Sequence, residues 1–506
     1  MESLNQDNIK ADQRTDLTDE QLNNLTNAEN QRQIEKHQKP KISEAEKTRN
    51  FYNPNKTTDL GNAERLAAVA EGDLKYVPGI GWYFYDSGVW LSDNHAAQEV
   101  YKNKLIGSLY EEVAAAAAVQ KKTGIEAVSA LSKWAMRSEG LGKAEGALGM
   151  AKSSPAFYTL PGKLDSDQML LNVKNGTVDL RTGKLRAHDR KDLITKLAPV
   201  DFDPSAKAPI FENFLLQIMG GDEELATFIQ RAVGYSLTGS VKEQCWFICY
   251  GVGANGKGTL LNALLQILGS YGTQAAPDLL MLARGGGEKH PTEQADLMGR
   301  RLVVAQETES GRQLAEVAVK QMTGGDKIKA RFMRGDFFQF DPTHKLWLAT
   351  NHKPVIRDTT ESTWRRIILI PFEVVIPADE RDKDLPEKLF SEFRGILAWA
   401  VAGCLEWQRS GLRIPERVRA AAEEYREESD VVGRFLEERT LKDAGNSEPL
   451  SKIFKSYQEW CGENNHRPMT TRTFSQSLQE RGFQKVKKEC GVVFLGVRVS
   501  PLSYST

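Results

Sequence analysis

Cysteine is scarce in this chain, and long hydrophobic runs are missing from it. The 506 residues include five cysteines, with no CxxC pair among them: Cys245, Cys249, Cys404, Cys461 and Cys490. Their spacing predicts reduced core residues and argues against a disulfide framework or a zinc site. No apolar run approaches the roughly 18 residues that cross a bilayer, and the N-terminal sequence has no hydrophobic export segment. These absences predict a cytoplasmic protein with no membrane partner.

The chain also lacks an excess of either charge. Lysine and arginine number 67 and aspartate and glutamate 68, which gives a formal net charge of −1. The field of the whole protein therefore neither supports nor opposes DNA binding, and any attraction to nucleic acid must come from local patches. A chain of this length is expected to form several domains, each with its own core.

Changes of composition predict how the chain is divided. Residues 1–56 are rich in Asn, Gln, Lys and Glu and poor in aromatics, which predicts a disordered or loosely helical tail. Residues 57–205 combine helical segments with aromatic strands and Asn-Gly and Thr-Gly turns, which predicts an α+β domain. Residues 206–372 have a helical lead-in followed by buried strands, and residues 373–433 are helical. Residues 434–506 form a small unit of two helices and a hairpin that resembles a winged helix.

The most informative segment is a glycine-rich loop between a strand-like run, Cys245 to Tyr250, and a helix-like run that begins at Thr259. Its glycines let backbone N–H groups surround a triphosphate, and Lys257 supplies a charge for the outer phosphates. The loop predicts binding of ATP or another nucleoside triphosphate. The expected nucleotide-binding residues are Gly251, Val252, Gly253, Ala254, Asn255, Gly256, Lys257, Gly258 and Thr259.

One position in this loop departs from the usual pattern. Gly258 follows the lysine, where such loops carry the Ser or Thr that ligates Mg²⁺, and Thr259 is the nearest hydroxyl. The Gly-Lys-Gly-Thr ending resembles that of adenylate kinases, so a nucleotide kinase is an alternative. A glycine-rich turn without a ligand is the structural alternative, and the flanking strand and helix argue against it.

Acidic and amide side chains follow two buried strand-like runs farther along the chain. Glu307 and Glu309 come after Arg301-Leu-Val-Val-Ala-Gln, and Asn351 comes after Lys345-Leu-Trp-Leu-Ala-Thr. Ligands bind at the carboxyl ends of strands in open α/β sheets. Glu307 or Glu309 is therefore expected to hold Mg²⁺ and polarise the attacking water, and Asn351 to orient that water or sense the γ-phosphate.

A pair of arginines, Arg365 and Arg366, begins a third apolar run that ends at Pro371. An arginine that reaches into a neighbouring site can contribute about 10³ to 10⁵ in rate. The alternative is that the arginines flank the strand as solvated charges, and one of the two is expected to do so.

Taken in order, these segments resemble the superfamily 3 helicase domain of the phage, plasmid and poxvirus primase-helicases. The matching stretches are GVGANGK, LVVAQETE, KQMTGGD, KLWLATNHKP and TWRRIILIPF, with DLGNAER and NGTVDLRTG upstream. The resemblance thus covers nearly everything from residue 57 onward. It implies a multidomain α/β and α+β chain with a P-loop AAA+-type ATPase core, usually a hexameric ring with ATP between subunits and single-stranded DNA in the channel.

The resemblance also implies roles for individual residues. Lys257 and Thr259 would serve the nucleotide and the metal, Glu307 the Walker B role, and Asn351 the role of sensor 1. Arg366, or Arg365, would be the arginine finger. Gly258 and Gln306 depart from the family pattern in the Mg²⁺ shell.

Basic residues occur in two places where DNA contacts are expected. Lys327, Lys329, Arg331 and Arg334 lie in an alternating segment just before the sensor strand, with Phe332 and Phe337 as candidates for base stacking. The related helicases project such a hairpin into the channel, although alternation alone also fits a solvated strand face. The terminal unit carries Arg472, Lys485, Lys487 and Lys488, which suit duplex or fork binding through phosphates. A protein-interaction module with a solvated basic face is the alternative.

The main hypothesis is an ATP-dependent DNA helicase that acts on single-stranded and forked DNA during replication, as a homo-hexamer. Only residues 1–56 precede the matching region, and they contain no strand with paired aspartates. Primer synthesis is therefore expected from a separate primase, if at all. The alternatives are a non-processive DNA-binding ATPase, acting as an origin-melting, loader or anti-invader factor, and the nucleotide kinase.

Overall fold

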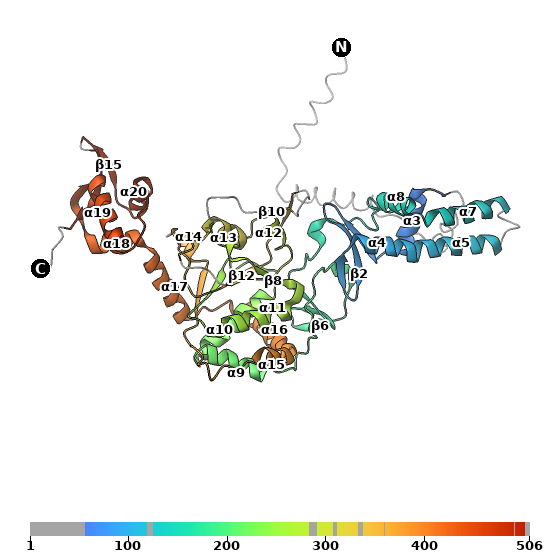
Figure 1. Cartoon of the computed structure of the whole chain (residues 1–506), viewed down its shortest axis with the longest axis horizontal. Helices are drawn as coiled ribbons and strands as arrows, with labels where there is room; N and C mark the ends of the chain where they lie inside the picture. The colour runs from blue at the N-terminus through green and yellow to red at the C-terminus, as the bar shows by residue number, and fades with distance from the viewer. Residues whose placement is uncertain are drawn as a thin grey trace, which may run out of the picture. The chain divides into compact units, whose positions relative to one another are not determined.

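The computed structural model describes residues 56–118, 125–282, 291–306, 311–331, 337–358, 360–489 and 491–500 (Figure 1). The chain divides into two compact units, one formed by residues up to 71 with 95–157, the other by 72–94 with the residues from 158 onward. Residues 57–205, expected as one α+β domain, therefore contribute to both units. The predicted tail, apart from Lys56, lies outside the described residues.

The first unit is helical and is organised around a buried asparagine. Asn62 is fully buried, donates to the Tyr101 hydroxyl at 3.3 Å and to Ser138 Oγ at 2.9 Å, and accepts from Trp134 Nε1 at 3.0 Å. A buried amide with several partners fixes the packing of the helices that supply them. The helices are α3 (Asp59–Val69), α4 (Asn94–Val100), a π-helical turn (Tyr101–Ile106), α5 (Gly107–Ala118), α7 (Ile125–Ser138) and α8 (Leu141–Ala151).

Two small antiparallel sheets open the second unit. The first contains β1 (Leu74–Val77), β2 (Gly81–Asp86) and β3 (Val89–Ser92), and the second β4 (Leu170–Val173), β5 (Gly176–Asp179) and β6 (Lys184–Arg186). The β2–β3 turn places Ser87 and Gly88 at positive φ, 46° and 94°, a conformation that a glycine accommodates easily. The aromatic hairpin and the Asn-Gly hairpin predicted from the sequence are confirmed.

The centre of the second unit is a parallel sheet of five strands. Its spatial order is β13-β7-β12-β9-β8, and every neighbouring pair is parallel. The strands are β7 (Trp246–Tyr250), β8 (Gly272–Ala275), β9 (Leu302–Gln306), β12 (Lys345–Thr350) and β13 (Ile367–Pro371). The buried strands predicted around the glycine-rich loop are confirmed. Because β12 lies between β7 and β9, the carboxyl ends of these three strands meet at one edge.

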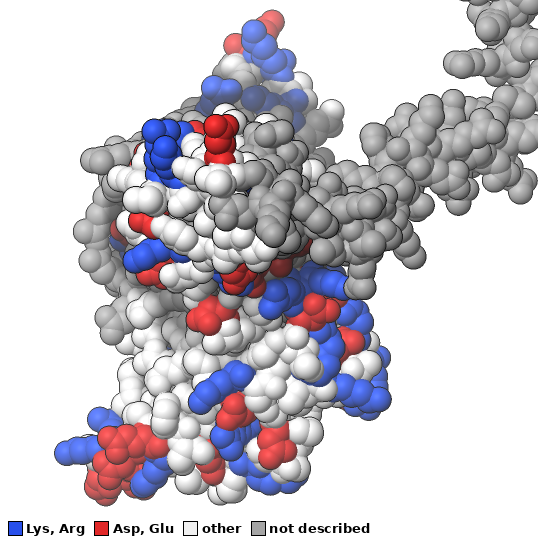
Figure 2. Space-filling view, turned by 90° about the vertical axis from the view of Figure 1, so that its right-hand side faces the viewer, with Lys and Arg blue, Asp and Glu red and all other residues white. Residues whose placement is uncertain are grey.

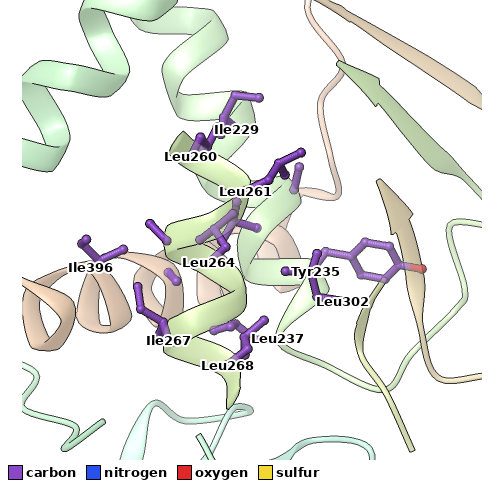
Figure 3. Packing of buried hydrophobic residues seen from close by; sticks show 14 of the residues in the cluster. Ile229, Tyr235, Leu237, Leu260, Leu261, Leu264, Ile267, Leu268, Leu302 and Ile396 are labelled. Carbon is purple, nitrogen blue, oxygen red and sulfur yellow. The ribbon is translucent and has the colours of Figure 1, made fainter. Parts of the chain in front are cut away.

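Helices cover both faces of this sheet. Alternate side chains of β7 point to opposite faces, so Phe247 and Cys249 belong to one hydrophobic cluster and Trp246 and Ile248 to the other. Figure 3 shows the first cluster, where leucines of α11 pack against residues of α10, α16 and β9. The helices on this side are α9 (Pro209–Ile218), α10 (Glu223–Ser236), α11 (Lys257–Leu268) and α16 (Phe393–Ser410). The parallel sheet with helices on both faces is compatible with the P-loop-type core that the sequence predicts.

The opposite face is covered by shorter segments, among them α13 (Glu316–Thr323) and the buried Tyr425 of α17 (Glu416–Ser429). The remaining elements of the core are α12 (Pro291–Ala295), β10 (Ile328–Ala330), β11 (Phe338–Phe340), α14 (Glu361–Trp364) and α15 (Leu385–Ser391). Short 3-10 turns occur at Pro161–Lys163, Arg190–Asp192, Gly269–Tyr271 and Pro277–Leu279. Four cysteines, Cys245, Cys249, Cys404 and Cys461, are buried and free, as expected, and Cys490 lies outside the described residues.

Buried cationic side chains lie at the opposite end of the strands, at the amino ends of β9 and β12. Arg301 donates to the carbonyls of Leu237 and Leu170 at 2.6 Å each, and the Lys345 ammonium donates to the carbonyl of Thr238. Leu237 and Thr238 directly follow the last residue of α10, where the helix dipole favours positive charge. His344, next to them, is fully buried, and burial lowers its pKa to about 3. These contacts fix α10 to the sheet.

The C-terminal segment folds in the order helix, strand, helix, helix, strand, strand. It contains α18 (Val431–Arg439), β14 (Thr440–Pro449), α19 (Leu450–Glu463), α20 (Thr471–Glu480), β15 (Lys485–Lys488) and β16 (Gly491–Val499). The strands form an antiparallel sheet in the order β14-β16-β15. Phe435, Tyr457, Trp460, Phe474 and Phe494 are fully buried in its core. The two predicted helices and the hairpin are therefore present, with an additional helix and strand before them.

Candidate functional site

The glycine-rich loop joins the carboxyl end of β7 to the amino end of α11. Two of its glycines are required by the geometry. A Cβ on Gly251 would lie 2.1 Å from the Phe372 carbonyl oxygen. Gly256 has φ of +79°, and a Cβ there would lie only 2.5 Å from Ile218 Cγ2. A side chain at Gly251 would clash with the backbone just after β13, and one at Gly256 would clash with α9. The loop therefore has the close packing of a phosphate-binding turn at a helix N-terminus.

Lys257 and Asn351 meet at the edge where β7 and β12 end. The Lys257 ammonium donates to the Gly251 carbonyl at 2.6 Å, to Asn255 Oδ1 at 2.9 Å and to Asn351 Oδ1 at 3.2 Å. The parallel register explains the meeting, because Thr350 lies opposite Tyr250. Lys257 is 6% exposed, and burial lowers its pKa. All three of these partners are neutral oxygens. A bound phosphate would therefore supply the negative counter-charge that the Lys257 ammonium does not have in these contacts.

Asn255 fastens the loop to the sheet. Its Nδ2 donates to the Phe372 carbonyl at 3.1 Å, and the side chain is buried. The Ile376 N–H donates to the Ala254 carbonyl at 2.9 Å, which ties the segment after β13 to the same loop. Asn255 was predicted only as part of the glycine-rich loop. The structure assigns it a positioning role, which the sequence pattern gave no sign of.

A cavity of about 630 Å³ lies beside the loop. Ala254, Gly256 and Thr259 form one side of it. The other sides come from α9, from the segment after β13 and from the first residue of α15: Ile210, Asn213, Phe214, Gln217, Ile376, Glu380, Arg381, Asp382 and Leu385. Sequence reasoning missed this wall. The signal was present in α9, where Asn213 and Gln217, one helical turn apart, interrupt an otherwise apolar face.

The acidic residues expected at this site follow β9 in the sequence. Glu307 and Glu309 lie outside the described residues, which reach Gln306 at the end of β9. Gln306 lies opposite Ala349 of β12 and donates to Asn262 Oδ1 of α11 at 3.0 Å. The chain thus leaves β9 at the same sheet edge as Asn351. Within the described ranges, no cluster of three or more His, Cys, Asp or Glu is arranged to hold a metal.

Arg365 and Arg366 differ in their surroundings. Arg366 is partly buried and donates to the Gln244 carbonyl at 3.3 Å and to Thr323 Oγ1 at 3.4 Å. Burial lowers its pKa. Arg365 is exposed. Both precede β13 and so lie at the amino edge of the sheet, away from the Lys257 of their own chain.

The described surface has no large area of one charge on the face shown in Figure 2, where acidic and basic side chains are interspersed. One local basic group lies on the β10–β11 hairpin. Lys329 and Arg331 are exposed, and their charged groups lie 4.8 and 5.0 Å from the Phe337 ring centroid. Phe337 is 52% exposed. Lys327 is exposed just before β10, while Arg334 and Phe332 lie outside the described residues.

The basic residues of the C-terminal segment fall on two faces. Arg472 is exposed on α20, and Lys485 and Lys487 share one face of β15 because alternate strand residues point the same way. Lys488 points to the opposite face. Sequence alone grouped all four residues, whereas the structure separates Lys488 from the others.

Family comparisons match most of the chain in separate stretches. A model described as "D5 N terminal like" matches residues 63–220, one described as "Family of unknown function" matches 249–366, and one described as "Poxvirus D5 protein-like" matches 427–495. No helix in the described part of the chain is long and apolar enough to cross a bilayer.

Individual relatives are similar at low identity. "Putative helicase L207/L206" of Acanthamoeba polyphaga mimivirus is 25% identical over 323 residues, covering 60% of this chain and 34% of that protein. "Putative helicase 022R" of Frog virus 3 (isolate Goorha) is 24% identical over 383 residues, covering 60% and 39%. The chain therefore spans 34% to 39% of the length of these relatives. Among solved structures, the apo NrS-1 C-terminal region aligns at 11% identity and a TM-score of 0.46, over 86% of this chain and 98% of that one.

Proposed function

Because the chain belongs to the D5-like primase-helicase family, we propose that it is an ATP-dependent DNA helicase that moves along single-stranded DNA. The meeting of Lys257 with Asn351, beside a cavity of about 630 Å³, is the observation that carries the proposal. A nucleoside triphosphate fits this arrangement, with phosphates on the loop and the nucleoside in the cavity. Two relatives are named as helicases, which agrees with this choice.

In the proposed mechanism, Lys257 exchanges its neutral oxygen contacts for the outer phosphates. Asn351 is then released to orient the attacking water or to sense the γ-phosphate. Mg²⁺ would be held by Thr259 and Glu307, with Glu309 as the second candidate carboxylate, and its charge would neutralise the charge developing on the phosphates. The other residues of the glycine-rich loop supply backbone N–H groups and the helix N-terminus.

A ring of identical subunits, which we propose to be a hexamer, would complete the site. The arginine pair lies at the amino edge of the sheet and so faces away from the nucleotide of its own chain. Arg365 is exposed and available to a neighbouring subunit, whereas Arg366 is held by internal contacts. We therefore favour Arg365 as the finger, although the family pattern favours Arg366.

The β10–β11 hairpin is the proposed contact with single-stranded DNA. Lys327, Lys329, Arg331 and Arg334 would bind phosphates, and Phe337 would stack on a base. The order of elements in the C-terminal segment supports a winged helix that meets the duplex at a fork, with a DNA contact from Arg472 and phosphate contacts from Lys485 and Lys487. A separate primase is a further proposed partner during replication.

Displacement of a labelled strand from a forked duplex tests the proposal. We expect ATP-dependent displacement by the unmodified chain, none by Lys257→Ala, and normal displacement by Lys174→Ala, which removes an exposed lysine of the β4–β5 turn. DNA-stimulated hydrolysis without displacement would instead favour an origin-melting, loader or anti-invader ATPase. Phosphate transfer to a mononucleotide would favour the kinase.

A further inference from the structure

A second cavity, of about 520 Å³, lies on the C-terminal segment. We call it the α20 groove. It is lined mostly by α20, with one residue each from β15 and the start of α19: Leu450, Thr471, Arg472, Ser475, Gln476, Gln479 and Lys485. Its lining is polar and basic on the helix side, so it is suited to a polar and anionic ligand.

The helix α20 presents a regular polar stripe to this groove. Phe474 and Leu478 are fully buried and hold the helix to its core. Arg472, Gln476 and Gln479 are exposed and follow the i, i+4, i+7 spacing of one helix face. Guanidinium and amide groups can make paired hydrogen bonds with the edges of guanine and adenine, respectively.

A buried hydroxyl lies in the same groove. Ser475 is 4% exposed, and its Oγ has no hydrogen-bond partner among the described residues. Serine hydroxyls inside helices ordinarily bond to a carbonyl one turn earlier, and a buried polar atom without a partner is costly. A ligand that supplies a donor or acceptor in the groove would remove this cost.

The basic residues flank the stripe on one side. Lys485 lines the groove, and Lys487 shares its strand face. Acidic charge is present as Glu480, which accepts from Gln476 Nε2 at 3.0 Å at the far end of the helix. The groove therefore combines phosphate-binding cations with side chains able to read base edges. An α-helix with its side chains is roughly 10–12 Å across and fits the major groove, which is about 12 Å wide.

We propose that the α20 groove reads the base sequence of duplex DNA. Arg472, Gln476 and Gln479 contact base edges, Ser475 lies at the floor of the contact, and Lys485 and Lys487 fix the register through phosphates. The preferred site would contain guanine and adenine at neighbouring positions. The inference rests on the proposed function in one respect, that the C-terminal segment meets duplex DNA, and it requires neither ATP nor unwinding.

Selection from a random duplex library with the full chain, without ATP, tests this proposal. We expect an enriched sequence that binds at least tenfold more tightly than its scrambled version at the same salt concentration. Gln476→Ala and Gln479→Ala should each reduce that preference by about 5- to 150-fold, the range for one lost base contact, and leave binding to the scrambled duplex unchanged. Ser475→Ala should lower the preference for the selected sequence over its scrambled version, and it should not lower the melting temperature of the protein.

Lysine variants separate base reading from phosphate binding. Lys485→Ala should weaken binding to both duplexes equally, and Lys488→Ala, on the opposite strand face, should change neither. The proposal is overturned by an absence of enrichment, or by glutamine variants that weaken both duplexes to the same extent. Strand displacement is measured separately. Unwinding of forked DNA without a sequence preference would contradict this inference and would still support the proposed function.

Discussion

Replacing Gly251 by alanine should weaken nucleotide binding by roughly a hundredfold or more, through the geometry of the loop alone. The new Cβ would lie 2.1 Å from the Phe372 carbonyl oxygen and 2.6 Å from Asn255 Nδ2, distances that no real contact tolerates. The loop must therefore move away from β13. That movement breaks the 3.1 Å hydrogen bond from Asn255 to the same carbonyl.

The cost follows from these contacts. Overpacking of a tight interior costs about 1–3 kcal/mol, and a buried amide left without its partner costs about 1–3 kcal/mol. A combined loss of about 3 kcal/mol in the binding-competent conformation lowers affinity by roughly a hundredfold or more. Gly253→Ala is the matched control, since a Cβ at Gly253 would have no heavy atom of the described residues within 4 Å.

Titration with a fluorescent ATP analogue measures both variants. We expect a Kd at least a hundredfold higher for Gly251→Ala and a change of less than threefold for Gly253→Ala, by the same conversion of energy to affinity. Equal losses in the two variants, or wild-type affinity in Gly251→Ala, would refute the argument from loop geometry. Circular dichroism melts establish that both variants fold.

Further predictions concern the sensor, the hairpin and the buried histidine. Asn351→Ala should lower the rate of ATP hydrolysis by about 10²- to 10³-fold and change the affinity for ATP little. An equal loss of rate and affinity would show that Asn351 acts in binding alone. Phe337→Ala should weaken single-stranded DNA binding by about 5- to 150-fold, the range for one stacked base, without changing the salt dependence; a lower salt slope would contradict stacking. Burial, and then the neighbouring Lys345, lower the pKa of His344 to about 3, so the folded state excludes a proton that the unfolded state binds. The contribution of neutral His344 to the free energy of unfolding is therefore fully present above pH 6.5. It is lost as the pH falls from 6.5 toward 3, by at most about 1.4 kcal/mol per pH unit. Urea unfolding across this range should show a shallower pH dependence for His344→Gln, and an unchanged slope would contradict the assignment.

Much of the core could be predicted because its signals are local. The apolar runs of β7, β9, β12 and β13 and the glycines of the loop determine strands, a turn and a helix within short windows. The parallel order then brings Lys257 and Asn351 together, although 94 positions separate them. A resemblance to a family supplied the roles of these residues, and the register of β7 and β12 accounts for their contact.

What sequence reasoning missed depends on contacts between distant segments. The cavity wall combines α9 with the segment after β13, and Asn255 reaches the Phe372 carbonyl across 117 positions. The division of residues 57–205 between two units likewise depends on which helices pack around Asn62. In the C-terminal segment, charge alone grouped Lys488 with Lys485 and Lys487, whereas the strand alternation places it on the other face.

The most direct test of the central claim is the rate of ATP hydrolysis with and without single-stranded DNA, for the unmodified chain and for Lys257→Ala. The account predicts that DNA raises the turnover of the unmodified chain severalfold, that Lys257→Ala has no turnover in either condition, and that Lys329→Ala keeps its basal rate but loses stimulation at low DNA concentration. Hydrolysis that depends on Lys257 but is indifferent to DNA would contradict the coupling of the nucleotide site to a DNA motor.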